Sequence, residues 1–198
     1  MTVTWTQHRF SGGVLALSVA NTVVHRDDAD LTFDRFEDRG EIARFAEAAN
    51  VYCADELGGR SLSVSPSAAV AAKIIALREA TDRLFRHVAG KGVLETDHLS
   101  EFMLAAAKAL EGHDDTVSPD RPFGSPERPL AFEAGVALSA LSLLQQDRLR
   151  RIRICRNCAW LFLDRSRNAS RLWCDMAVCG NRQKAKRHYR RQMAEKGG

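Results

Sequence analysis

The stretch Cys155-Arg-Asn-Cys158, followed after fifteen intervening residues by Cys174-Asp-Met-Ala-Val-Cys179, decides the fold of the C-terminal part of this 198-residue chain. Two close cysteine pairs at this separation are typical of a zinc site, because each short loop supplies two of the four soft ligands that tetrahedral zinc requires. Four thiolates complete the coordination sphere and leave no position for a catalytic water. We therefore predict one structural Zn²⁺ ion with the ligands Cys155, Cys158, Cys174 and Cys179.

The residues between and after the two cysteine pairs predict a small mixed fold. We expect a knuckle at residues 154–158, a strand at 160–163, a turn at 164–168 and a returning strand at 172–174. Cys179 would then begin a helix. This order of knuckle, β-hairpin and helix is treble-clef-like, and metal binding would supply folding free energy that so small an apolar core cannot.

Charge divides the chain into two unlike parts. From residue 148 to the end there are 15 Lys and Arg against 3 acids, a local charge of +12, whereas the first 147 residues carry −8. The total of +4 conceals this asymmetry. Such a distribution indicates an acidic body and a basic arm that binds a polyanion.

The basic arm is expected to be a helix that is amphipathic by charge. At 100° per residue its cations share one arc, and the less basic side suits packing on the zinc knuckle; that side carries Ala185, His188, Tyr189 and Gln192. No acid lies between Asp175 and Glu195, so the repulsion among the cations is uncompensated, and a phosphate backbone would relieve it. The plainer alternative is a solvated, frayed chain end.

Nucleic acid is therefore the predicted partner of the C-terminal module. The predicted contacts on the helix are Arg182, Lys184, Lys186, Arg187, Arg190 and Arg191. Three arginines of the predicted hairpin would extend the same basic patch, namely Arg165, Arg167 and Arg171.

Residues 1–146 predict a mainly α-helical body, and residues 147–198 the zinc finger with its basic helix. Helical apolar spacing favours helices at 41–53, from Ser65-Pro66 to about residue 90, from an Asp97 cap to 112, and at 132–149. Four prolines between residues 112 and 129 predict a loop or linker there. The expected core contains Leu17, Phe45, Val70, Ile74, Leu77, Leu84, Phe102, Leu141 and Leu144.

Composition and motifs exclude several classes of protein. With 45% hydrophobic and 27% charged residues the chain is typical of a soluble domain, and no apolar run of about 18 residues predicts a membrane span. The first ten residues lack the pattern of a signal peptide, so we expect a cytoplasmic protein with reduced thiols. We find no nucleophile, phosphate-loop or dinucleotide motif and predict no enzyme activity. Without ligand spacing, the expected surface residues are His87, His98 and His113.

The C-terminal motif resembles the CGNR zinc-finger family. The resemblance is carried by Cys155-Arg-Asn-Cys158-Ala-Trp160-Leu-Phe162-Leu-Asp164, by Trp173-Cys174 and by Cys179-Gly180-Asn181-Arg182. In that family the N-terminal half is an ABATE domain, which usually shows an aspartate and an aromatic residue before an Asn-Thr pair. Here residues 15–22, ending in Asn-Thr, match that pattern only in part. The resemblance implies a stress-linked transcription regulator of bacterial type.

Three functions remain open at this point. The leading hypothesis is a DNA-binding regulator whose helical body is a sensor or dimerisation domain, which leaves a homodimer and an unidentified small ligand of the body as further partners. An RNA-binding protein is the first rival, because aromatic side chains could stack on unpaired bases; these are Trp160, Trp173 and Tyr189. The second rival is a module that grips an acidic protein. Sequence alone specifies neither the target site nor the signal that the body would sense. It also does not specify whether the protein would activate or repress transcription.

Overall fold

Apolar residues at helical spacing build the body of the protein, as the sequence predicts. The computed structural model describes residues 3–196, and about 52% of the chain is helical. The helices are η1 Gln7–Phe10, α1 Leu15–Ala20, α2 Gly40–Tyr52, α3 Ala54–Leu57, α4 Ala68–Lys91, α5 Thr96–Leu110, α6 Phe132–Ser142, α7 Gln146–Leu149, η2 Met176–Gly180 and α8 Asn181–Lys196. The strands are β1 Val23–Val24, β2 Phe33–Asp34, β3 Leu62–Ser63, β4 Leu130–Ala131, β5 Ile152–Ile154 and β6 Leu161–Leu163.

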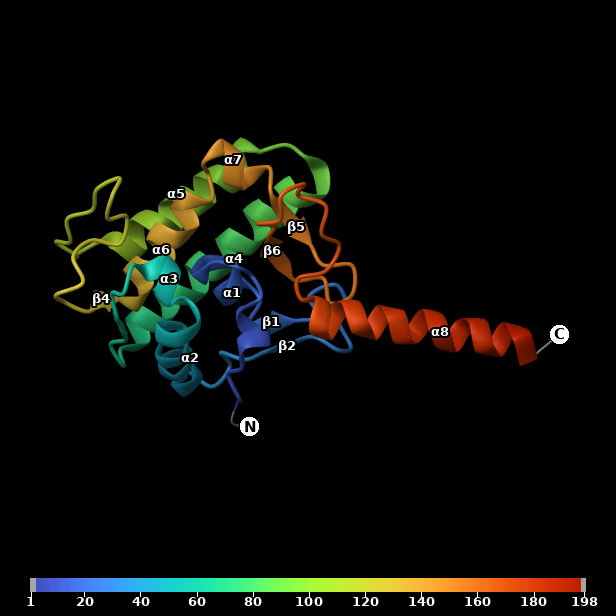
Figure 1. Cartoon of the computed structure of the whole chain (residues 1–198). Helices are drawn as coiled ribbons and strands as arrows, with labels where there is room; N and C mark the ends of the chain where they lie inside the picture. The colour runs from blue at the N-terminus through green and yellow to red at the C-terminus, as the bar shows by residue number, and fades with distance from the viewer. Residues whose placement is uncertain (1–2, 197–198) are drawn as a thin grey trace.

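The core lies where α1, α4, α5 and α6 pack against one another (Figure 1). Helix α1 is buried along its whole length, so it forms the centre around which the longer helices are arranged. In the described part of the chain, three two-stranded sheets complete the fold: β1 with β2 and β5 with β6 are antiparallel, and β3 with β4 is parallel. None of the helices within residues 3–196 combines the length and apolarity needed to cross a lipid bilayer.

Most of the predicted core is confirmed. Fully buried side chains include Leu17, Phe45, Ile74, Leu77, Leu84 and Phe102. The other three predicted core residues are only partly buried, although they pack against the same cluster; they are Val70, Leu141 and Leu144. Val70 lies in the first turn of α4, and the two leucines lie at the C-terminal end of α6.

Helix boundaries differ from the predicted ones in places. The cap of α4 is Ser67, whose hydroxyl accepts from Ala69 N, two residues beyond the predicted Ser65. The single helix predicted at 132–149 is wrong, because it breaks after Ser142 into α6 and α7. The Ser142 hydroxyl donates to the Ser139 carbonyl and accepts from Arg148, a local competition with helical bonds that the apolar pattern does not reveal.

The proline-rich segment between α5 and β4 is an irregular loop, as predicted, but it is anchored. Arg60 is buried beneath it and donates to the carbonyls of Phe123 and Arg128, while it also pairs with Asp115. The Phe123 ring is buried under the same loop. One internal cation therefore organises a segment that has almost no regular backbone bonds of its own.

The β5–β6 hairpin packs directly on the body. The side chains of Ile152 and Leu161 belong to the same hydrophobic cluster as the body helices. The Asn21 amide at the end of α1 both donates to the Leu161 carbonyl (2.8 Å) and accepts from its N–H (2.9 Å). The Ala159 carbonyl accepts from Arg86 of α4 at 2.8 Å. The boundary between residues 146 and 147 stays a prediction.

Candidate metal centre

The four predicted cysteines converge on one point. The Sγ atoms of Cys158, Cys174 and Cys179 lie 3.7 Å from one another, and the Sγ of Cys155 lies within 4.8 Å of all three. Thiolates held about 2.3 Å from a tetrahedral zinc ion would be about 3.8 Å apart. The spacing of the sulfurs therefore fits a four-coordinate zinc ion, and the chain holds one structural zinc site.

The first cysteine pair is positioned by the turn between β5 and β6. The Cys155 N–H donates to the Trp160 carbonyl (2.8 Å), and the Ala159 N–H donates to the Cys155 carbonyl (2.9 Å). Ala159 has a positive φ of 58°, which turns the chain sharply after Cys158. The knuckle that the sequence predicts is thus a tight loop that presents both sulfurs on the same side.

The second cysteine pair is positioned by Asp175. Its carboxylate accepts from the N–H groups of Ala177 (2.8 Å) and Val178 (3.3 Å), so it caps the helical turn η2 that carries Cys179. The Asn181 side chain donates back to the Ala177 carbonyl at 2.9 Å. This one turn joins the metal centre to α8. The helix predicted after Cys179 is therefore confirmed.

The predicted hairpin partner is wrong. Strand β6 pairs with β5, which precedes the first cysteine, and not with residues 172–174. The loop between Leu163 and Cys174 is instead organised by Asp164, which is fully buried and accepts from the N–H groups of Ser166 (2.9 Å) and Arg171 (2.8 Å). The edge of β6 that faces away from β5 is occupied by Asn21 and by the Gly12 carbonyl, so residues 172–174 do not pair with it. The treble-clef assignment stays a prediction.

The crowded thiols need a cation before they can all ionise. Hydrogen bonds from Cys158 and Cys174 lower the pKa of the Cys155 thiol. The same contacts with Cys155 raise the pKa of Cys158 and of Cys174, because a second thiolate would face the first. The Asn157 amide also donates to the Cys179 sulfur at 3.4 Å. Metal binding therefore releases protons from the site.

A layer of buried aromatic residues surrounds the sulfurs. Trp160 and Phe162 pack with the cysteines in a small cluster that also includes Val24 of the body. His8, from the N-terminal segment, stacks on Trp160 with ring centroids 5.4 Å apart, and its Nδ1 lies 2.8 Å from the Asp175 carboxylate. The body thus covers one side of the metal centre.

The predicted nucleic-acid contacts on the helix all lie on α8 and are all exposed; they are Arg182, Lys184, Lys186, Arg187, Arg190 and Arg191. Helix α8 projects away from the rest of the molecule (Figure 1). Its predicted packing face is wrong, because the following side chains are exposed as well: Ala185, His188, Tyr189 and Gln192. The helix contacts the knuckle instead through Gln183, whose amide donates to the Asn157 side chain at 2.8 Å.

The three arginines of the predicted hairpin lie in the loop after β6 and differ from one another. Arg165 donates to the Gly13 carbonyl (2.6 Å), and Arg171 donates to the Cys174 carbonyl (2.6 Å) while it lies over the Phe162 ring. Arg167 is exposed. Two of the three therefore have structural partners within the chain, and their contact with nucleic acid stays a prediction.

The structure brings together one group of residues that the sequence does not connect. His87 of α4 lies with its Nε2 3.2 Å from the Glu95 carboxylate, and His98 of α5 lies with its Nδ1 3.7 Å from it. Only Glu95 and His98 show helical spacing, so the sequence could not reveal the third member. Cys53 is buried, and burial raises its pKa to about 12, which leaves it an unreactive core thiol.

Comparison with protein families matches residues 151–192 to the CGNR zinc finger. The match covers β5, β6, all four cysteines and most of α8, and it leaves the helical body outside. No curated protein matches the chain. Residues 151–192 therefore match a CGNR zinc finger, and the four cysteines within them form a site for one structural zinc ion.

Proposed function

We propose that this protein is a zinc-containing nucleic-acid-binding protein, and specifically a DNA-binding transcription regulator. The observation that carries the proposal is α8, a strongly basic helix that begins at the metal centre and whose residues 184–193 are all exposed. We propose no enzymatic activity, because the sequence contains no nucleophile, phosphate-loop or dinucleotide motif and four thiolates leave zinc no open position for a substrate or water.

The charge of α8 is difficult to explain without a polyanion. Arg182 and Lys186, Lys186 and Arg190, and Arg187 and Arg191 are like-charge pairs at i, i+4, each of which destabilises an isolated helix. A helix of 16 residues is also marginal in water without tertiary packing. Contact with phosphates would replace the repulsion by attraction and would release condensed counterions.

The shape of α8 suits duplex DNA. Sixteen residues give a helix about 24 Å long. A helix of ordinary diameter enters the major groove, which is about 12 Å wide. Because zinc fixes the first turn through Cys179, the body would set the angle at which the helix meets the duplex. The projecting position of α8 leaves room for this approach (Figure 1).

Burial of one of the three candidate stacking residues disfavours the RNA alternative, and a second, Trp173, is partly buried against the metal-binding cysteines. Trp160 is only 5% exposed within the aromatic layer, so it cannot stack on an unpaired base. Tyr189 on α8 is exposed, but one ring is a small platform. The alternative of a module that grips its own acidic body lacks support, because α8 extends away from that body. An acidic protein partner remains an outcome of the test below.

The body would then be the sensor or dimerisation domain. Support comes from the partial resemblance of residues 15–22 to the ABATE pattern, and from Asn21 of that stretch, which binds β6 of the finger. A signal received by the body would thus reach the finger through α1. A homodimer would place two α8 helices on neighbouring half-sites.

Salt dependence of binding tests the role of α8. The double substitution Arg187→Ala with Arg191→Ala should weaken binding to duplex DNA and flatten the plot of log affinity against log salt by up to about two units. The matched control, Arg121→Ala with Arg128→Ala, removes the same charge from the exposed loop of the body and should leave the slope unchanged. Fluorescence anisotropy with a labelled duplex measures both.

Zinc content must stay the same in both double variants. If the Arg187 and Arg191 variant retains its affinity and salt slope, α8 is a solvated helix and the proposal is wrong. If wild-type protein binds duplex DNA weakly even at low salt, an acidic protein becomes the better partner.

A further inference from the structure

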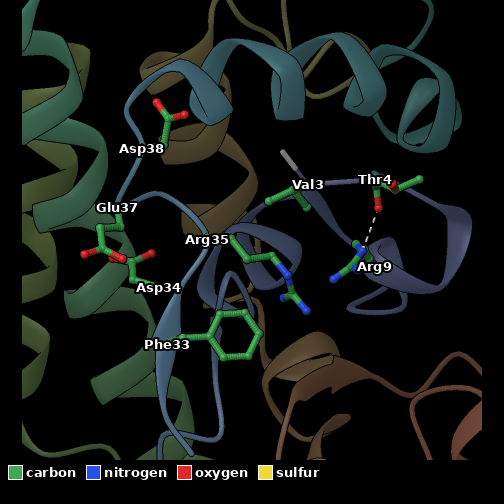
Figure 2. Close-up of a pocket in the computed structure, with 8 residues that line it drawn as sticks. All are labelled: Val3, Thr4, Arg9, Phe33, Asp34, Arg35, Glu37 and Asp38. Carbon is green, nitrogen blue, oxygen red and sulfur yellow. Dashed lines mark hydrogen bonds between the residues drawn. The ribbon is translucent and has the colours of Figure 1, made fainter. Parts of the chain in front are cut away.

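Two arginines share an open pocket on the body. Arg9 and Arg35 both line a pocket of about 680 Å³ between the N-terminal segment and β2, and Figure 2 shows their guanidinium groups directed toward each other. Both side chains are half-buried. The volume is within the range of pockets that hold small ligands, about 300–1,000 Å³.

Neither guanidinium has an acidic partner among the side chains that the structure describes. Arg9 donates from Nε to the Thr4 carbonyl (2.8 Å), and Arg35 donates from one Nη to the Asn21 carbonyl (3.2 Å). Their other N–H groups form no hydrogen bond within the described residues. The two fully buried arginines, Arg60 and Arg78, each pair with a carboxylate.

The acids that line the same pocket do not neutralise the pair. Asp34 is held by Arg78 at 2.6 and 2.8 Å, and Asp38 accepts from the Gly40 N–H at 2.9 Å. In Figure 2 the carboxylates of Asp34, Glu37 and Asp38 lie on the far side of the pocket from the two guanidinium groups. The arginines therefore leave an uncompensated positive charge at one end of the pocket.

The electrostatics of Arg35 agree with this geometry. Burial, together with the charge of Arg9, lowers the pKa of Arg35 to about 10, and burial also lowers the pKa of Arg9. An anion between the two groups would offset their repulsion and raise both pKa values. Two guanidinium forks that face one another also match the planar oxygens of a carboxylate or the oxygens of a phosphate.

An aromatic wall completes the site. The Arg35 guanidinium lies 5.4 Å from the centroid of the Phe33 ring, and Phe33 is 51% exposed. An exposed ring beside an anion site suits a ligand with an apolar or aromatic part next to its charged group. The ligand class is therefore a small organic anion and not a free inorganic ion.

The same arginine also touches the finger. Its guanidinium lies 5.3 Å from the ring of Trp160, which packs against the metal-binding cysteines. His8, which precedes Arg9 in the chain, stacks on the same Trp160 ring. His8 also binds the carboxylate of Asp175, the residue that follows Cys174. A ligand that repositions the two arginines would thus change the packing around the zinc site.

We propose that the pocket lined by Arg9, Phe33 and Arg35 binds a small organic carboxylate or phosphate monoester between its two guanidinium groups, and that Trp160 relays its occupancy to the finger. The binding part stands independently of nucleic-acid binding, whereas the regulatory part rests on the function proposed above. The ligand would be the signal that the body senses.

Phenyl phosphate is a suitable probe, with benzoate and inorganic phosphate for comparison. Titration calorimetry on the zinc-loaded full chain should give saturable binding with a Kd of about 1 mM or tighter for phenyl phosphate or benzoate, and weaker binding of inorganic phosphate. Arg35→Gln and, separately, Arg9→Gln should each weaken binding at least about tenfold. Arg128→Gln, on the exposed loop far along the chain, is the matched control and should bind as wild type.

The outcomes separate the two proposals. Absence of saturable binding of either aromatic anion, or unchanged binding in both pocket variants, overturns the anion site whatever the protein does with DNA. If no anion binds and Arg35→Gln instead flattens the salt slope for duplex DNA, the arginines contact nucleic acid and the anion site is wrong. If the anion binds but duplex affinity is the same with and without it, the relay through Trp160 is refuted.

Discussion

Replacement of Asn21 by alanine should destabilise the whole protein, because this buried side chain makes one of the contacts that join the finger to the body. The Asn21 amide is 2% exposed and makes both a donor and an acceptor bond to the backbone of Leu161, at 2.8 and 2.9 Å. These two backbone groups lie on the edge of β6 that does not face β5, so no strand can replace the amide.

The size of the effect follows from what is left unpaired. Leu161 is fully buried, and a buried N–H or C=O without a partner costs about 1–3 kcal/mol. Loss of both partners should therefore lower the free energy of unfolding by about 2–5 kcal/mol. The matched control is Asn168→Ala in the exposed loop of the finger, which should change stability by less than about 0.5 kcal/mol.

Urea unfolding of the zinc-loaded protein measures this difference by two probes. Far-ultraviolet circular dichroism reports the helices of the body, and tryptophan fluorescence includes Trp160 beside the metal centre. In Asn21→Ala both transitions should move together to lower urea. A loss below about 0.5 kcal/mol, or a separate early fluorescence transition with the helical transition unmoved, would refute the reasoning about this contact.

Three further predictions concern the metal and the loop. Purified protein should contain one zinc ion per chain by elemental analysis. Cys174→Ser should lose the zinc, whereas Cys53→Ser, which changes an isolated buried thiol, should keep it. Retention of zinc by Cys174→Ser would contradict the ligand set. Zinc affinity should fall as pH falls, because neighbouring thiols raise the pKa of Cys158 and Cys174 and protons then compete with the metal. Competition with a chelator measures this affinity. The same zinc affinity at all pH values would argue against a thiolate site. Arg60→Leu should release the loop between α5 and β4, and limited proteolysis should then cleave within residues 112–129, while Arg44→Leu, at an exposed position, should resist like wild type.

The metal centre could be predicted from the sequence because its signal is local. Each cysteine pair is a short loop, and four thiols at that spacing are a strong signature of a zinc site. The mainly helical body was also predictable, since residues such as Ile74 and Leu84 recur with the helical period. Both signals depend on residues close together in the chain.

The missed features depend on contacts between distant residues. Asn21 and Leu161 are 140 residues apart, and nothing in the sequence connects an asparagine at a helix end with one strand of a finger. Residues 172–174 were predicted to pair with β6. Because one edge of β6 docks on the body, β5 is its only sheet partner within the described residues. Arg9 and Arg35 meet for the same kind of reason, through the fold of the N-terminal segment over β2.

The most direct test of the central claim is a gel-retardation assay of the wild-type, zinc-loaded protein. Labelled duplex DNA from genomic fragments would compete with single-stranded RNA of equal length. We predict a discrete retarded band that survives excess nonspecific competitor for at least one duplex fragment, that RNA does not displace, and that chelation of zinc abolishes. Equal binding of RNA, or no retarded band with any duplex at low salt, would contradict the assignment of this protein as a DNA-binding regulator.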